Sequence, residues 1–267
     1  MTLDNRTFDN IRDTVYRHSG IALADHKKTL VSSRLGKRIR VLGLDGFKDY
    51  YDYLRDDESG RELILLIDAI STNVTHFFRE AKHFEVLAAA LRERYDKGQR
   101  KFRIWCAASS TGEEPYSLAI TVRESLGDDA DARILATDIS TGVLARAQRG
   151  VYEQKHVEKM DPEVLRRWFM RGNGGGEVSF QVRPELRGIV NFGRLNLSEQ
   201  DWPIKGPLDM IFCRNVMIYF DNDLRARLVE RFYSLLREGG LLFTGLSESL
   251  TKMAGEFNKI QPSVYLK

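Results

Sequence analysis

Residues 101–140, KFRIWCAASSTGEEPYSLAITVRESLGDDADARILATDIS, decide the fold, because the pattern of apolar residues changes twice within them. Residues 101–109 form a short apolar run that is typical of a buried strand, and residues 111–127 have helical spacing. A second apolar run follows at 132–140. Strand, helix and strand in this order predict a parallel sheet covered by helices, and such sheets bind ligands at the carboxyl ends of their strands.

The same alternation continues toward the C-terminus. We expect further strands at 188–197, 208–220 and 241–249, and helices at 141–150 and 222–240. Residues 259–267 are expected to form an edge strand, where Pro262 is tolerated. The stretch between the strands ending at 140 and starting at 188 is longer than one crossover helix requires. A helix opened by Asp161 and Pro162, followed by the glycine-rich residues 171–187, predicts a small strand-rich insertion there.

The N-terminal part is expected to contain helices only. Phe8, Ile11 and Val15 recur at helical spacing, and Gly20 closes that helix. Further helices are expected at 26–43, 45–56, 61–71 and 82–95. No linker-like stretch marks the end of this part, so the domain boundary is placed between residues 70 and 85.

Composition and cysteine content indicate a globular protein of a reducing compartment. Of 267 residues, 42% are hydrophobic and 30% charged. Cys106 and Cys213 lie in apolar runs and are expected to be buried thiols rather than a disulfide. No run approaches the ~18 apolar residues of a membrane span, and the first twenty residues lack the apolar core of a signal peptide. We therefore expect a cytoplasmic protein.

The net charge of +3 is too small to define a partner, but the cations are unevenly distributed. Between Asp25 and Asp45 there is no acid, and six lysines and arginines fall there. At 100° per residue, Lys27, Arg34 and Arg38 cluster beside the apolar stripe of the expected helix. A solvated helix face and a binding surface both explain this pattern.

Two features at the ends of the expected strands point to a nucleotide ligand. The first strand leads into a turn of small residues, CAASSTG (106–112), and such a turn lets backbone N–H groups approach a ligand closely. The turn matches neither a P-loop nor the GxGxxG pattern, having only Gly112. Asp138 ends the second strand, where an acid either accepts from both hydroxyls of a ribose or caps the next helix. Together these features favour an adenosine-bearing ligand, with NAD and S-adenosylmethionine both open.

Polar residues also stand out in two other segments. TNVTHFFRE (72–80) contains Asn73, Thr75 and Arg79, of which the arginine is a planar cation suited to a carboxylate. A helix cap followed by an exposed arginine would give the same pattern. FCRNV (212–216) places Arg214 and Asn215 at the carboxyl end of a buried strand, where packing alone does not favour polar side chains.

Several segments, in this order and at this spacing, closely resemble the CheR-type chemotaxis methyltransferases. They are TNVTHFFRE (72–80), STGEEPYS (110–117), ATDIS (136–140), RNVMIYF (214–220) and GLSES (245–249), with GIALADHKK (20–28) and SRLGKRIRVLGL (33–44) in the helical part. The resemblance covers nearly the whole chain. It implies a doubly wound, Rossmann-like α/β sheet. It also implies an all-helical domain at 1–75, a methyltransferase domain at 76–267, and a small antiparallel β-subdomain inserted at 160–190.

The resemblance further implies the reaction and its site. Members of this family transfer the methyl group of S-adenosylmethionine to glutamate side chains of chemoreceptors, giving methyl esters and S-adenosylhomocysteine. Matching positions assign the cofactor site to Asn73, Thr75, Arg79, Glu114, Asp138, Asn196, Leu197, Arg214 and Asn215. Arg79 and Tyr219 are the expected catalytic residues, acting by positioning, because a glutamate carboxylate is already ionised at neutral pH and needs no general base.

The partners implied by the resemblance are methyl-accepting chemotaxis receptors. The cations Lys27, Arg34, Lys37 and Arg38 are expected to meet the acidic methylation helices of the receptor. The glycines Gly172, Gly174, Gly175 and Gly176 correspond to a loop that captures a receptor C-terminal pentapeptide in some members of the family. Val178 stands where those members carry a further glycine.

Three other classes of protein are alternatives to this assignment. An NAD-dependent oxidoreductase would carry a proper GxGxxG turn. A nucleic-acid methyltransferase would usually show an NPPY-like or catalytic-cysteine motif, and neither Cys106 nor Cys213 lies in such a context. A non-catalytic adaptor that binds the cofactor as a sensor is excluded only by turnover.

Overall fold

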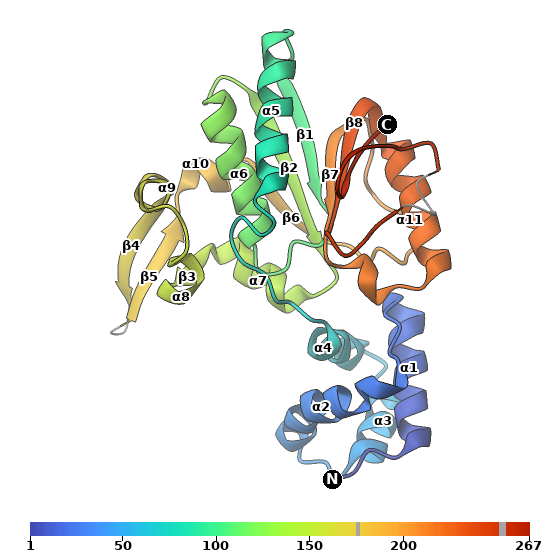
Figure 1. The fold of residues 1–267 in the computed structure, drawn as a ribbon. Coiled ribbons are helices and arrows are strands. Elements are labelled where there is room, and N and C mark those ends of the chain that lie inside the picture. Colours follow the sequence, from blue (N-terminus) through green and yellow to red (C-terminus); the bar gives the residue numbers. More distant parts are fainter. Residues whose placement is uncertain (175–176, 251–254) are drawn as a thin grey trace.

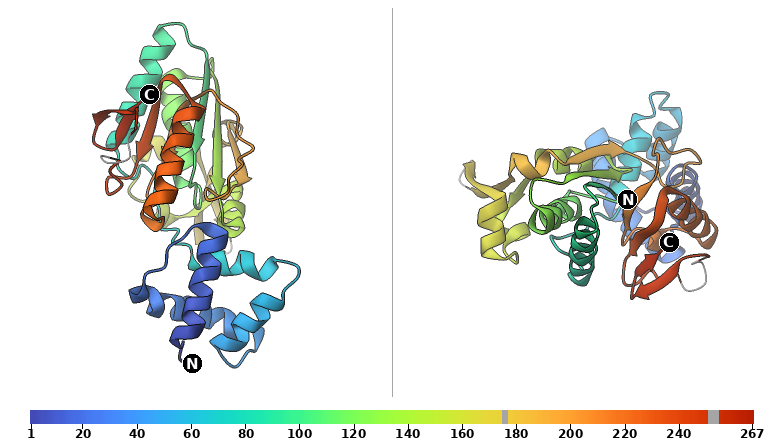
Figure 2. Two further views of the ribbon diagram at one scale, coloured as in Figure 1. Left: turned by 90° about the vertical axis from the view of Figure 1, so that its right-hand side faces the viewer. Right: turned by 90° about the horizontal axis from the view of Figure 1, so that it is seen from above.

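The computed structural model describes residues 1–174, 177–250 and 255–267 (Figure 1). A helical domain at the N-terminus packs below a larger α/β domain (Figure 2). Irregular residues 71–81 connect the two, and the boundary expected at 75/76 lies within this segment. Among the described residues, no helix combines the length and the apolar character needed to cross a lipid bilayer.

The helical domain contains α1 (Asn5–Ser19), η1 (Asp25–Lys27), α2 (Lys28–Leu42), α3 (Phe47–Asp56) and α4 (Arg61–Ile70). Asp4 caps the start of α1 by accepting from the Thr7 N–H, and Gly20 ends it with a φ of 72°, as its sequence position predicts. The apolar stripe of α2, Val31, Leu35 and Ile39, is fully buried in the core of this domain. The expected helices are therefore confirmed.

The main sheet has seven strands in the order β6-β2-β1-β7-β8-β10-β9. Their bounds are β1 (Lys101–Cys106), β2 (Asp131–Asp138), β6 (Val190–Arg194), β7 (Leu208–Cys213), β8 (Leu236–Thr244), β9 (Asn258–Gln261) and β10 (Val264–Leu266). The five strands from β6 to β8 are parallel, which confirms the expected doubly wound fold. The expected single edge strand at 259–267 is wrong. It is an antiparallel hairpin with Pro262 in its turn, and β10 pairs with β8.

Helices cover both faces of this sheet. On one face, α5 (Lys82–Asp96) and α6 (Glu113–Leu126) bury Leu87 and Leu118 against Ile104 of β1. On the other face, α11 (Asn222–Leu235) buries Phe232 against Trp105. The helix expected at 222–240 ends earlier, because residues 236–240 belong to β8. Cys106 and Cys213 are free and buried, as predicted.

The order of the strands reverses between β1 and β7. From β1 the chain moves outward through β2 to β6, then returns to β7 and continues to β8. The carboxyl ends of these strands point toward the helical domain (Figures 1 and 2). Parallel sheets bind ligands outside such a switch point, so this edge is where the fold positions a site. α7 (Thr141–Arg149) begins there, just after β2.

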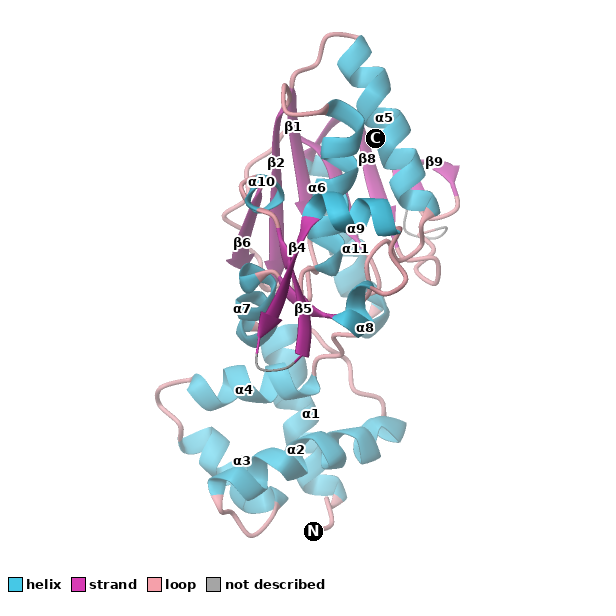
Figure 3. Ribbon diagram, turned by 90° about the vertical axis from the view of Figure 1, so that its left-hand side faces the viewer, coloured by secondary structure: helices cyan, strands magenta, loops and turns pink. Residues whose placement is uncertain are grey.

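A second, three-stranded antiparallel sheet forms the insertion, seen in front of the main sheet in Figure 3. Its order is β3-β5-β4, with β3 (Val151–Glu153), β4 (Phe169–Gly174) and β5 (Glu177–Val182), and it includes α8 (Gln154–Val157) and α9 (Pro162–Trp168). α10 (Pro184–Arg187) leads back to the main sheet. The insertion begins earlier than expected, because a three-residue strand has too little periodicity to predict. Gly175 and Gly176 lie outside the described residues.

Candidate active site

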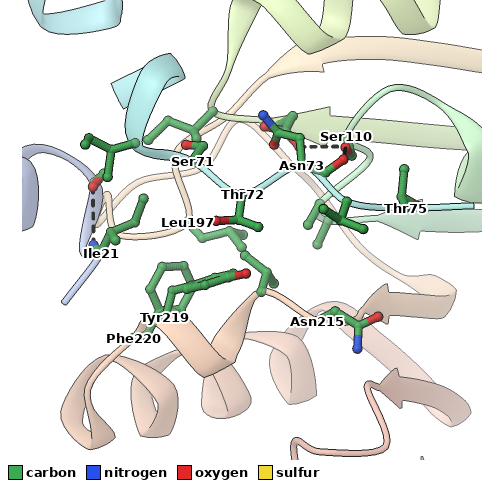
Figure 4. A pocket seen from close by; sticks show the side chains of 18 of the residues that line it. Ile21, Ser71, Thr72, Asn73, Thr75, Ser110, Leu197, Asn215, Tyr219 and Phe220 are labelled. Carbon is green, nitrogen blue, oxygen red and sulfur yellow. Dashed lines mark hydrogen bonds between the residues drawn. The ribbon is translucent and has the colours of Figure 1, made fainter. Parts of the chain in front are cut away.

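A cleft of about 1160 Å³, including the solvent space at its mouth, lies at the switch point between the sheet and the helical domain (Figure 4). Its walls come from the carboxyl ends of the parallel strands, from residues 70–75 and from residues 19–23. Every residue that the sequence assigns to the cofactor or to catalysis lines it: Asn73, Thr75, Arg79, Glu114, Asp138, Asn196, Leu197, Arg214, Asn215 and Tyr219. Residues from five separate segments thus meet in one place.

Asp138 organises the floor of the cleft. Its Oδ2 accepts from the Ser110 N–H at 2.8 Å, and its Oδ1 accepts from the Ser140 N–H at 3.0 Å. Burial raises the pKa of Asp138, and these two N–H groups act in the opposite direction. Each carboxylate oxygen has a further lone pair, so Asp138 is able to accept from the hydroxyls of a ribose as well.

A buried ion network forms one wall of the cleft. The Arg214 guanidinium donates to Glu114 at 2.8 Å and to Glu80 at 3.1 Å, and it also donates to the Arg79 carbonyl. Burial raises the pKa of Glu114, and the Arg214 charge opposes this shift. Burial alone would also raise the pKa of Glu80, but Arg214 and the hydrogen bonds to this carboxylate hold it below its usual range. Within the network one cation faces two carboxylates, and this excess of negative charge favours a cationic ligand.

Glu80 is a site residue that the sequence reasoning missed. It lies in TNVTHFFRE directly after Arg79, so proximity to a candidate residue was the available signal. Its backbone φ is 58°, a conformation that is uncommon for a residue with a side chain. This conformation accompanies hydrogen bonds to Glu80 from Asn215 and from the Leu246 N–H, both at 3.3 Å.

Asn215 also has a positive φ, and Glu248 supports it. The Glu248 carboxylate accepts from the N–H groups of Asn215 at 2.7 Å, Gly245 at 2.6 Å and Ile218 at 3.2 Å. A Cβ at position 245 would lie 2.5 Å from the side-chain Nδ2 of Asn215, so only glycine fits there. Glu248 is the acid of the GLSES segment, which the sequence had singled out without assigning it a role.

The helical domain completes the cleft. Ile21, Ala22 and Leu23 line it, and the Ala22 N–H donates to the Tyr219 carbonyl at 2.8 Å. Tyr219, at the end of η2 (Met217–Tyr219), lies with its ring toward Leu197 and Thr72 (Figure 4). The sequence reasoning missed these contributions from residues 19–23, because a loop of mixed polarity carries no site signal.

The Asn196 side chain makes hydrogen bonds to other residues of the protein. Its side-chain amide donates to the His18 carbonyl at 2.9 Å, and its oxygen accepts from the Ser198 N–H at 3.0 Å. These bonds hold the loop after β6 against the end of α1. Asn196 therefore shapes the cleft by joining the two domains.

Family models match almost the whole chain. The "CheR methyltransferase, all-alpha domain" matches residues 6–71, and the "CheR methyltransferase, SAM binding domain" matches residues 73–266. The chain belongs to the CheR methyltransferase family. A chemotaxis protein methyltransferase of Salmonella typhimurium is 42% identical over 99% of this chain and 91% of its own length. Chemotaxis protein methyltransferase 2 of Pseudomonas aeruginosa is 46% identical over 97% of this chain and 91% of its own length. The chemotaxis protein methyltransferase of Escherichia coli is 41% identical over 99% of this chain and 92% of its own length.

This CheR-family protein is therefore an S-adenosylmethionine-dependent chemotaxis methyltransferase, and the residues of its cleft fit that cofactor. Asp138 has acceptor capacity for ribose hydroxyls at the switch point of the sheet. The excess negative charge beside Glu114 suits a sulfonium and an ammonium group. Neither feature requires the GxGxxG turn that a dinucleotide would use.

The four cations expected to contact the receptor are not equivalent in this CheR-family protein. Lys27 and Lys37 are exposed. Arg38 pairs at 2.6 Å with Glu62, which is buried, and Arg34 donates to backbone carbonyls at the end of α4. Both arginines therefore have acceptors within the protein, because α4 packs beside α2 and supplies them for both guanidiniums.

Proposed function

We propose that this protein transfers the methyl group of S-adenosylmethionine to glutamate side chains of chemoreceptors, in the cytoplasm, as part of chemotactic adaptation. The observation that carries the proposal is the charge distribution in the cleft. Its carboxylates, Glu114 and Asp138, are already engaged as acceptors, while the cations Arg79 and Lys27 line the same cleft. The negative charge beside Glu114 is thus left to the cationic cofactor, and Arg79 and Lys27 suit an anionic substrate that brings its own nucleophile.

In this reaction the main task of the protein is to align the carboxylate with the methyl group. S-adenosylmethionine, when bound, supplies an electrophilic methyl group on a positively charged sulfur. An ionised glutamate would attack this methyl in line. As the new C–O bond forms the C–S bond would break, the opposite charges would cancel, and S-adenosylhomocysteine would leave as a neutral thioether. No residue needs to remove a proton. We propose that Arg79 and Tyr219 hold the carboxylate in position and exclude water, and that Asn73, Thr75, Glu114, Asp138, Asn196, Leu197, Arg214 and Asn215 form the cofactor site.

The proposal is tested with receptor-bearing membranes and S-adenosylmethionine carrying a labelled methyl group. We expect label to enter the receptors, and receptors whose methylation glutamates are replaced by glutamine to stay unlabelled. Label that enters the substituted receptors equally, or that enters other proteins only, contradicts the proposed substrate.

Exposed cations on α2 are proposed to attract the acidic methylation helices. Lys37→Glu combined with Arg40→Glu is expected to raise the KM for receptor about tenfold, because surface charges mainly steer encounter. Initial rates at varied receptor concentration measure this, and the native rate should also fall with added salt. Lys48→Glu combined with Lys205→Glu, two exposed lysines on α3 and before β7, reverses the same number of charges and is the control for net charge. An equal effect of the control would remove the special role of α2.

The insertion is proposed to bind the C-terminal pentapeptide of a receptor. Within the described residues, β4 pairs only with β5, so its outer edge is available to an added strand. At least one C-terminal peptide from the receptors of its own organism is expected to bind with a Kd below about 100 μM. Replacing Gly174 and Gly175 with valine should abolish this binding and spare methylation of receptors without such a tail. Titration calorimetry that detects no peptide binding would refute the tether.

A further inference from the structure

Residues 71–75 form a wall of the cleft but belong to no helix or strand. All five line the cleft, and Figure 4 shows Thr72 facing Tyr219 and Leu197. They follow α4, whose last carbonyls have no partner within the helix. Side chains from other elements must therefore supply the hydrogen bonds that fix this wall.

Arg34, in the middle of α2, supplies those at the end of α4 and at the start of the wall. Its Nη1 donates to three carbonyls in succession, those of Ala69 at 3.3 Å, Ile70, and Ser71 at 2.8 Å. Its Nη2 donates to the Thr72 hydroxyl at 3.2 Å. A guanidinium carries several donors in one plane, and its positive charge is favourable at the negative end of a helix dipole. Arg34 thus caps α4 and holds the start of the wall.

The remainder of the wall is held from the other side of the cleft. The Ser110 hydroxyl donates to the Asn73 carbonyl at 3.1 Å, and Arg79 donates to the Val74 carbonyl at 3.0 Å. α4 is also tied to α7, because Asp68 accepts from the Gly142 N–H at 3.3 Å. The wall is therefore fixed between α2 and the loops that surround Asp138.

We propose that Arg34 is a positioning residue for the cofactor cleft. It fixes residues 71–75 in the shape that the cofactor requires, so its loss weakens cofactor binding in the absence of any receptor. This differs from a role in receptor contact, which would change the KM for receptor and leave cofactor affinity unchanged. The proposal concerns cofactor binding alone and does not rest on the identity of the methyl acceptor.

Calorimetric titration with S-adenosylmethionine, without receptor, tests the proposal. Arg34→Gln is expected to raise the Kd at least about tenfold, since two hydrogen bonds to the end of α4 and two to the start of the wall are lost. Arg34→Lys should be intermediate, because an ammonium caps the helix but cannot span the same acceptors. Thermal unfolding of each variant shows that it is folded at the titration temperature.

Arg38→Gln is the matched control. Arg38 lies one turn along α2, is also half-buried, and pairs with Glu62 rather than with the wall. Its replacement is expected to lower the unfolding temperature and to leave the Kd for cofactor unchanged. A native Kd in Arg34→Gln would overturn the proposal, and so would an equal loss of affinity in Arg38→Gln, which would assign the effect to general loosening of the helical domain.

Discussion

Asp138→Ala is expected to weaken S-adenosylmethionine binding about a hundredfold and to leave the protein folded. Losing two hydrogen bonds from ribose to a charged acceptor costs on the order of 3 kcal/mol, which corresponds to a factor of this size. The same carboxylate also fixes the N–H groups of Ser110 and Ser140, so the floor of the cleft loosens as well. Calorimetric titration of the folded variant measures the loss.

Asp138→Asn and Asp131→Asn separate this effect from a general one. Asp138→Asn keeps one acceptor oxygen, so its affinity should fall between those of the native and alanine proteins. Asp131, at the start of β2 and at the opposite end of the strand, pairs with Arg103, and its replacement should not change cofactor affinity. An unchanged Kd in folded Asp138→Ala would remove Asp138 from the cofactor site.

Arg79→Ala is expected to lower turnover on the order of a hundredfold, with little change in unfolding temperature. A misplacement of about 1 Å between reacting groups is enough for an effect of this size. The Arg79 side chain is half-buried and, among the described residues, has one hydrogen bond, to the Val74 carbonyl, so few folding contacts are lost. Initial rates at saturating cofactor and receptor, beside thermal unfolding curves, measure the two effects separately.

Arg79→Lys and Arg92→Ala are the controls for this prediction. The lysine variant keeps the charge without the planar donors, so partial activity is expected. Arg92 is exposed on α5, away from the residues that line the cleft, and its replacement should leave turnover unchanged. Normal turnover in Arg79→Ala would assign this residue a structural role.

The sequence predicted the fold well because long segments carry the signal. Alternating apolar runs and helical spacing locate the parallel strands, and the polar residues at their ends meet where such strands end together. Asp138 and Arg214 could be placed in one site for this reason. Short elements escaped prediction: β3 has three residues, and the turn at Pro262 divides a stretch that resembles a single strand.

The contacts between distant residues could not be predicted in the same way. The helical spacing of α2 shows that Arg34 and Arg38 share a side of the helix, but it does not show that α4 covers that side. The pairing of Arg214 with Glu80 and Glu114 joins three separate segments. Such pairs depend on tertiary packing, and the periodicity of a single segment carries no information about that packing.

We propose that the methyl group goes to a carboxylate oxygen of the receptor. The most direct measurement is the chemical stability and position of the transferred label in the receptor. We predict that mild base releases the label as methanol, and that mass spectrometry of untreated peptides finds the added methyl group on glutamate. A base-stable label, or a methyl group on lysine or another nitrogen, would contradict the account.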